Sequence, residues 1–140
     1  MKKTTFVLAG DSFITQRLPH NAALRALRRY LRSFSVRFTN FEILLHDFEV
    51  YPAPVSGGTW AAARPSVLED LEYLGFNLYT WANNHTIDWN IDGLLTTMRH
   101  LDAAGVIHAG VGRNLAEASQ PKYLDTPNAR VAIIGVTSTI

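Results

Sequence analysis

The chain has 140 residues, of which 47% are hydrophobic and 18% are charged, and it contains no cysteine. This length fits one compact domain, and this composition is typical of a globular protein with a buried core, which argues against a disordered chain. A formal net charge of +1 argues against nucleic acid as a partner. Without cysteine there are no disulfides and no thiolate ligands, so any metal ion must be bound by oxygen and nitrogen atoms.

The first third of the sequence predicts a strand, a helix and a second strand. An unbroken apolar run at residues 5–9, of the kind that lies in a parallel sheet covered on both faces, is expected to be the first strand. Because this run is too short for a signal peptide or a membrane span, we expect the chain as written to be cytoplasmic. A helix follows its N-cap Asn21, and the second strand is expected at residues 36–39. Leucines at helical spacing should face inward on this helix, opposite Arg25, Arg28, Arg29 and Arg32.

The middle of the sequence continues the alternation of helices and strands. Residues 51–60 are rich in proline and glycine and are expected to form a long loop. Pro65 is placed to begin the next helix and Gly75 to end it. Further along, the pattern predicts a strand at residues 77–82, a helix at 92–104 and a strand at 106–109.

The last part of the sequence predicts a glycine-rich loop, a short helix and a β-hairpin. The loop at residues 110–114 lacks both the full glycine spacing of a dinucleotide site and a phosphate-binding lysine, so we interpret it as a tight turn at a pocket rim. A short helix is expected at residues 116–119, and two strands at 123–125 and 130–136. The whole pattern predicts an α/β fold, with a layered sheet flanked by helices.

Polar side chains follow three of the predicted strands. Asp11 follows the first, Asn40 and Glu42 the second, and the Asn84-His85 pair the third. Because parallel strands end at one edge of a sheet, we expect these groups to converge on a divalent cation, for which carboxylate, amide and imidazole are suitable ligands. Each also has a structural alternative, because Asp11 can cap a turn, Glu42 can be a surface carboxylate, and a single histidine is often a buried structural residue.

Asp88, three residues after His85, has two interpretations. Its carboxylate either accepts a hydrogen bond from the His85 imidazole and fixes the tautomer, or it caps the helix that follows. The other histidines lack a partner at ligand spacing and are expected at the surface or around the metal ligands; they are His20, His46, His100 and His108.

Five motifs occur in an order and spacing similar to those of one known family. They are residues 9–11, Asn40-Phe41-Glu42, residues 81–88, a helix carrying Gly93 and Thr97, and residues 110–114 followed by Glu117-Ala118 and Pro121. The pattern resembles the CapA family of capsule synthesis, also called the PgsA type of poly-γ-glutamate biosynthesis, a branch of the calcineurin-like metallophosphoesterase fold. The resemblance implies a four-layer α/β/β/α arrangement in the complete family domain, of which residues 1–140 form the N-terminal portion.

The same resemblance implies roles for individual residues. It makes Asp11, Glu42 and Asn84 metal ligands, with Glu42 placed to bridge two ions, and it makes His85 a catalytic group supported by Asp88. The cofactor is then one or two divalent ions, such as Mn²⁺, Zn²⁺, Fe or Mg²⁺, with later histidines of the family completing the site. Where the family has a glycine, Asn90 can supply a left-handed turn. Contacts to the ligands or to the substrate are expected from Asn40, Asn83, Arg113 and Asn114.

Two hypotheses for function follow from the resemblance and the residues. In the first, water activated by divalent ions hydrolyses a phosphoester or a related bond, while His85 protonates the leaving group. In the second, the domain is a non-catalytic scaffold of capsule assembly or export that binds an anionic polymer through its arginine-rich helix. The expected partners are an anionic polymer or phosphoester substrate and other capsule-synthesis proteins. Family members are often membrane-anchored and extracellular.

Overall fold

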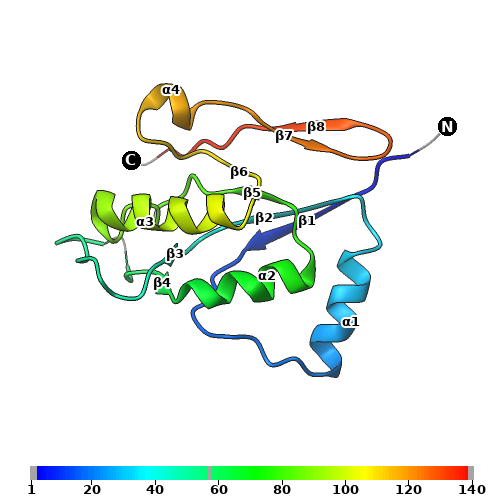
Figure 1. Cartoon of the computed structure of the whole chain (residues 1–140), viewed down its shortest axis with the longest axis horizontal. Helices are drawn as coiled ribbons and strands as arrows, with labels where there is room; N and C mark the ends of the chain where they lie inside the picture. Colours follow the sequence, from blue (N-terminus) through cyan, green and yellow to red (C-terminus); the bar gives the residue numbers. More distant parts are fainter. Residues whose placement is uncertain (1–2, 57, 139–140) are drawn as a thin grey trace.

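The central element of the computed structural model is a four-stranded parallel sheet with strand order β1-β2-β5-β6 (Figure 1). The structure describes residues 3–56 and 58–138. Neighbouring strands in this sheet are all parallel, because each connection between them returns the chain to the edge where the strands begin. The four carboxyl ends therefore lie together at the opposite edge. The predicted α/β class is therefore confirmed. The strands are β1 (Phe6–Asp11), β2 (Val36–Asn40), β5 (Leu78–Thr80) and β6 (His108–Ala109).

Most helix boundaries follow from local signals in the sequence. Asn21 caps the first helix by accepting a hydrogen bond from the Leu24 N–H, and Gly75 ends the second with a left-handed φ of 95°. No helix in the described part of the chain has the length and apolarity that a bilayer span requires. The helices are α1 (Ala22–Leu31), α2 (Leu68–Leu74) after a 3-10 turn at Pro65–Val67, α3 (Asn90–Ala103) and α4 (Leu115–Ala118).

A second, two-stranded parallel sheet was not predicted from the sequence. It pairs β3 (Leu44–Leu45) with β4 (Ala62–Ala63), and both strands are too short to give a periodic signal. Helix α3 completes the hydrogen bonding of this sheet, because the buried Thr97 hydroxyl accepts from the Leu45 N–H at 2.8 Å. Gly93 permits the close approach, since a Cβ there would lie 3.1 Å from Leu44 Cδ2 and 2.4 Å from Trp89 Cβ.

We expect the Thr97→Val substitution to lower the free energy of unfolding by about 1–3 kcal/mol, because it leaves the buried Leu45 N–H without an acceptor. Urea denaturation monitored by fluorescence of the tryptophans measures this change. Thr97→Ser keeps the hydroxyl and is the matched control, which should retain most of the stability. A larger loss in Thr97→Ser than in Thr97→Val would show that the methyl group, and not the hydrogen bond, is what matters.

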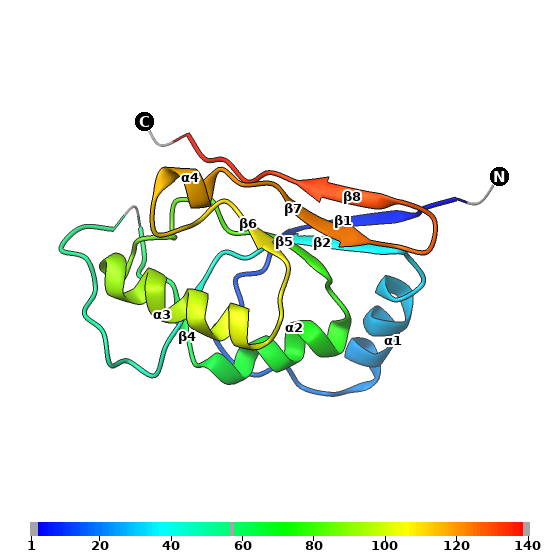
Figure 2. The same cartoon turned by 45° about the horizontal axis from the view of Figure 1, so that its top comes forward.

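The β-hairpin of β7 (Lys122–Asp125) and β8 (Arg130–Ile133) was predicted and is confirmed. In both views it lies on the side of the parallel sheet away from α2 (Figures 1 and 2). The expectation that both faces of the first strand are covered is wrong, because β1 is an edge strand and Leu8 keeps 70% of its surface exposed. Helices and a hairpin thus flank the sheet, which gives a layered α/β arrangement.

The expected orientation of α1 is confirmed only in part, because Leu31 is buried but the other leucines are more exposed. Leu27 keeps 45% of its surface exposed. Arg28 instead stacks on Tyr73, with its guanidinium carbon 4.6 Å from the ring centroid, and donates to the Tyr73 carbonyl. Arg32 donates to the carbonyls of Glu72 and Tyr73. These carbonyls belong to the last turn of α2 and have no partner within the helix, so two arginines face α2 where leucines were expected.

Candidate metal centre

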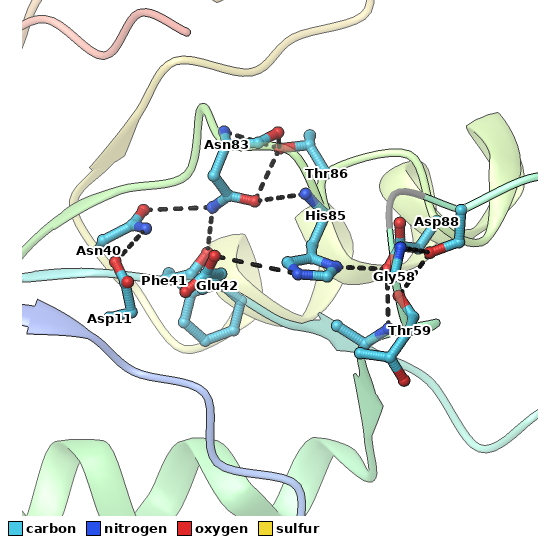
Figure 3. A network of polar contacts seen from close by, with 12 residues as sticks. Asp11, Asn40, Phe41, Glu42, Gly58, Thr59, Asn83, His85, Thr86 and Asp88 are labelled. Atoms are coloured by element: carbon cyan, nitrogen blue, oxygen red, sulfur yellow. Dashed lines mark hydrogen bonds and ion pairs between the residues drawn. The ribbon is translucent and has the colours of Figure 1, made fainter. Parts of the chain in front are cut away.

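Polar side chains from three parallel strands meet at the carboxyl edge of the sheet (Figure 3). Asp11 ends β1 and Asn40 ends β2, and the Asn40 amide donates to Asp11 Oδ1 at 2.8 Å. Asn83, which follows β5, donates to Asn40 Oδ1 at 3.2 Å and to the Phe41 carbonyl at 2.9 Å. The two asparagines therefore fix Asp11 relative to the segments that carry Glu42 and His85.

His85 is held at its Nδ1 atom by the buried Asp88. The His85 Nδ1 to Asp88 Oδ2 distance is 2.6 Å, and the same oxygen accepts from the Ala61 N–H at 2.8 Å. Of the two interpretations of Asp88, the structure shows the imidazole partner, since the N-cap residue of α3 is Trp89. With its proton on Nδ1, the neutral imidazole presents the Nε2 lone pair on its other side.

That Nε2 atom faces a pair of carboxyl groups. It lies 4.0 Å from Glu42 Oε1, and both side chains are largely buried, with 11% and 15% of their surfaces exposed. Burial raises the pKa of Glu42, and the Asp11 carboxylate raises this pKa further through its negative charge and a hydrogen bond, whereas His85 acts in the opposite direction. A cation bound beside Glu42 would offset both the burial of its charge and the repulsion from Asp11.

The other residues expected at the site lie around this cluster or outside it. Asn84 is exposed and lines a neighbouring groove of about 680 Å³ together with Asn83 and Asp88. Asn114 caps α4 by accepting from the Glu117 N–H, and Arg113 pairs with the Glu117 carboxylate at 3.1 Å. The structure thus gives Arg113 and Asn114 local roles at the start of α4.

The donor set is consistent with part of a hard-cation site. Within residues 3–56 and 58–138, no three His, Cys, Asp or Glu side chains already form a metal-binding group. Asp11 and Glu42 nevertheless supply carboxylate oxygens from the ends of adjacent strands. The pKa of Glu42 is raised first by burial and then by the negative charge of Asp11, which a cation would neutralise. The residues fit a cation, with further ligands needed to complete its coordination.

The sequence did not indicate that the loop before β4 is bound to the His85–Asp88 pair. The Asp88 carbonyl accepts from the Ala53 N–H at 2.7 Å, in addition to the contact between its carboxylate and Ala61. Phe13 also packs edge-on against His85, with ring centroids 5.4 Å apart. A main-chain partner of this kind has no residue-type signal, so only the folded chain reveals it.

The positions of two other histidines correct the sequence prediction. His46 and His108, expected at the surface or around the ligands, are buried in the interior, and burial lowers the pKa of each. His46 stacks near Trp89, with ring centroids 4.3 Å apart. The left-handed turn expected at Asn90 is confirmed by a φ of 56°.

Comparison with known proteins agrees with the motif pattern. The family model for the bacterial capsule synthesis protein PGA_cap matches residues 5–140. Two proteins of Sinorhizobium fredii, the uncharacterized proteins y4sH and y4uA, are each 35% identical to the chain over a match that covers 96% of this chain and 30% of theirs. The chain thus spans under a third of the length of these curated relatives. Its nearly complete match to the family model shows that the chain belongs to the bacterial capsule synthesis protein family.

Proposed function

We propose that this protein acts in capsule synthesis, of the poly-γ-glutamate type, through a metal-dependent hydrolase site at the carboxyl edge of its parallel sheet. The observation that carries the proposal is the pairing of two carboxyl groups, Asp11 and Glu42, with an imidazole that is itself oriented by a buried carboxylate. A carboxyl group with a raised pKa, here Glu42, next to an oriented histidine is typical of catalytic sites. The substrate class is a phosphoester or related bond, in an anionic polymer or its precursor.

His85 is the catalytic residue of this proposal, and Asp88 positions it. Asp88 accepts a hydrogen bond from the Nδ1–H group, which leaves Nε2 free to take a proton or, once protonated, to give it to a leaving group. The buried carboxylate of Asp88 also stabilises the imidazolium form during that transfer. Because Nε2 faces Glu42, the proton is moved on the side of the imidazole where the carboxyl pair lies.

Asp11 and Glu42 would hold the cation, which supplies a Lewis acid and lowers the pKa of a bound water. Asn40 keeps the Asp11 carboxylate in place by its amide hydrogen bond, and Asn83 keeps Asn40 in place. Asn84 is exposed beside them in the groove, where it can approach a cation or the substrate. The groove is lined by Asn83 and Asp88, each of which contacts His85, and in this proposal it would receive the substrate.

We expect Mn²⁺ or Zn²⁺ to raise the thermal midpoint of the protein, and we expect Glu42→Gln to abolish this rise. The raised pKa of Glu42 means that its charged form costs stability, so the stability it contributes is present at low pH and lost as pH rises through that pKa. Glu42→Gln should therefore stabilise the metal-free protein at neutral pH, by about 1 kcal/mol. Thermal unfolding with and without metal, together with calorimetric titration, measures both effects.

Asp47→Asn is the matched control, because Asp47 is an exposed carboxylate that pairs with Arg64 outside the cluster. It should leave the metal effect unchanged, whereas Asp11→Asn should remove it. Turnover of a generic phosphodiester by the protein, lost in Asp11→Asn, tests the hydrolase part of the proposal separately. A metal effect that survives in both Asp11→Asn and Glu42→Gln would refute the assignment of the ligands.

A further inference from the structure

A buried histidine, His46, holds a backbone turn in place directly after β3. Its side chain is fully buried and packs against Trp89, with ring centroids 4.3 Å apart. Its Nδ1 atom accepts a hydrogen bond from the Phe48 N–H at 3.0 Å, so the neutral ring carries its proton on Nε2. Within the described part of the chain, Nε2 has no hydrogen-bond partner. These contacts therefore suit the neutral ring and not the protonated one, which would have donors on both nitrogens.

The turn that His46 holds has a strained backbone. Phe48 has a φ of 66° and Asn90 a φ of 56°, in the left-handed region that residues with a Cβ rarely adopt. Within residues 3–56 and 58–138, these are the two non-glycine residues with a positive φ. They lie on segments that contact each other, because the Asn90 amide donates to the Tyr51 carbonyl at 3.0 Å. Such strain persists only where the surrounding contacts hold it, and the Nδ1 acceptor of His46 is one of them.

Residues 48–53 join His46 to the turn before α3. At the far end of this segment, the Ala53 N–H donates to the Asp88 carbonyl at 2.7 Å. The carboxylate of Asp88 contacts the His85 imidazole at 2.6 Å. Loosening residues 48–53 would therefore remove a main-chain contact from the residue that orients His85.

The charged groups around His46 come from its own segment and from the neighbouring elements. Burial is the main influence and lowers the pKa of His46. The carboxylates of Glu49 and Asp47 raise this pKa, and the charge of His100 on α3 lowers it. Arg64, directly after β4, offsets part of the effect of Asp47 because it pairs with that carboxylate at 3.2 Å. The ring therefore takes up a proton only below the usual pH range of histidine.

We propose that His46 is a pH-sensitive switch, whose neutral ring holds residues 48–53 on the turn before α3 and whose protonation releases them. A proton on Nδ1 replaces the acceptor of the Phe48 N–H by a second donor, so the hydrogen bond is lost. The left-handed turn at Phe48 then loses a contact that holds it, and the new charge is buried. Release of the segment lets the ring reach water. The switch does not depend on the metal site, and only an effect on turnover would rest on the proposed function.

Amide hydrogen exchange, followed by NMR from about pH 8 to about pH 4, tests the switch. The Ala53 N–H reports on the segment, the Tyr79 N–H of β5 reports on the sheet, and the ¹⁵N shifts of the His46 ring report on protonation. Between the ordinary pKa of histidine, about 6.5, and its lower value in the fold, we expect the protection of Ala53 to fall about tenfold per unit of pH. Ala53 should stay less protected than Tyr79 throughout, because the segment opens while the sheet stays folded.

Two substitutions of His46 separate the acceptor from the titration. His46→Asn places an oxygen near the position of Nδ1 and does not titrate, so Ala53 should keep its protection and lose its steep pH dependence. His46→Leu has no acceptor, so Ala53 should exchange about tenfold faster than in the unmodified protein at about pH 7. His108→Asn is the matched control, because it removes another buried histidine with a lowered pKa and should leave the pH dependence at Ala53 unchanged.

A steep pH dependence at Ala53 that persists without His46 would overturn the proposal, because another residue would then be the titrating group. Both variants at position 46 should lack this dependence, so either one decides if the other does not fold. Protection of Ala53 equal to that of Tyr79 would also overturn the proposal, since the segment would then open only when the sheet unfolds. Turnover is not a readout here, so failure of the hydrolase function would leave the outcome unchanged.

Discussion

His85→Ala is expected to lower kcat for phosphodiester hydrolysis by about 10²–10⁴-fold, the usual contribution of a positioned general acid or base. The imidazole Nε2 lies on the side of the ring that faces Glu42, 4.0 Å from its carboxyl oxygen. Because His85 is not required to hold the cation in this proposal, the thermal shift with Mn²⁺ should persist in the variant. Steady-state kinetics and the metal-induced thermal shift, measured on the same preparation, separate the two roles.

Asp88→Asn tests the positioning of His85 in the same experiment. An asparagine can offer its amide to the imidazole and so favours the opposite tautomer, with the proton on Nε2. The ¹⁵N chemical shifts of the His85 ring should report this change, which a purely structural role would not produce. Asp92→Asn removes an exposed carboxylate from the first turn of α3 and is the control. A variant Asp88→Asn with normal kcat and an altered tautomer would refute the role given to His85.

The clustering of the candidate site could be predicted from the sequence because one rule of parallel sheets is enough to place it. Asp11, Asn40 and His85 each follow an apolar run, and strands that run parallel end at one edge. The contact between His85 and Asp88 was also foreseeable as one of two alternatives, since the two residues are only three positions apart. The exposed position of Asn84 could not be predicted from the sequence, because a residue next to a strand end can face either side of the turn.

Features that depend on contacts between distant segments could not be predicted. The pairing of β3 with β4 involves two residues on each side, and the Thr97 hydroxyl of α3 completes it. On α1 the periodicity of the leucines favoured an inward apolar face, but the carbonyls and the Tyr73 ring at the end of α2 attract arginines to that contact. The cap formed by Asn114 and Glu117 is local and has the spacing of a capping box, but the expected role of Asn114 was contact with the metal ligands or the substrate.

Asp70 is a fully buried carboxylate that holds the segment between β1 and α1 against α2. It accepts from Arg17 Nε at 2.8 Å, from the Leu18 N–H at 2.9 Å, and it lies 2.9 Å from His20 Nε2. Burial alone would raise the pKa of Asp70, but the hydrogen bonds from Arg17, His20 and the Leu18 N–H together lower it. Asp70 thus attaches the segment after Asp11 to α2, together with the more exposed ion pair between Arg17 and Glu69.

Asp70→Asn is expected to lower the free energy of unfolding at pH 7 by about 2–3 kcal/mol, because it removes one partner of a buried charged network. A carboxyl group whose folded pKa is depressed contributes stability above its unfolded pKa, and this stability is lost as pH falls through the folded value. The difference between the protein and the variant should therefore be constant above about pH 5 and shrink below about pH 4. Urea denaturation at a series of pH values measures it.

The control for this series is Asp47→Asn, which removes an exposed carboxylate that makes a single ion pair with Arg64. Exposed pairs of this kind contribute little to stability, so the urea midpoint should be unchanged at every pH. A difference between the protein and Asp70→Asn that stays constant down to pH 2 would show that shape, and not charge, makes Asp70 important. If it shrinks as expected, the attachment of the segment behind Asp11 is electrostatic, and acid should loosen the candidate metal centre before it unfolds the sheet.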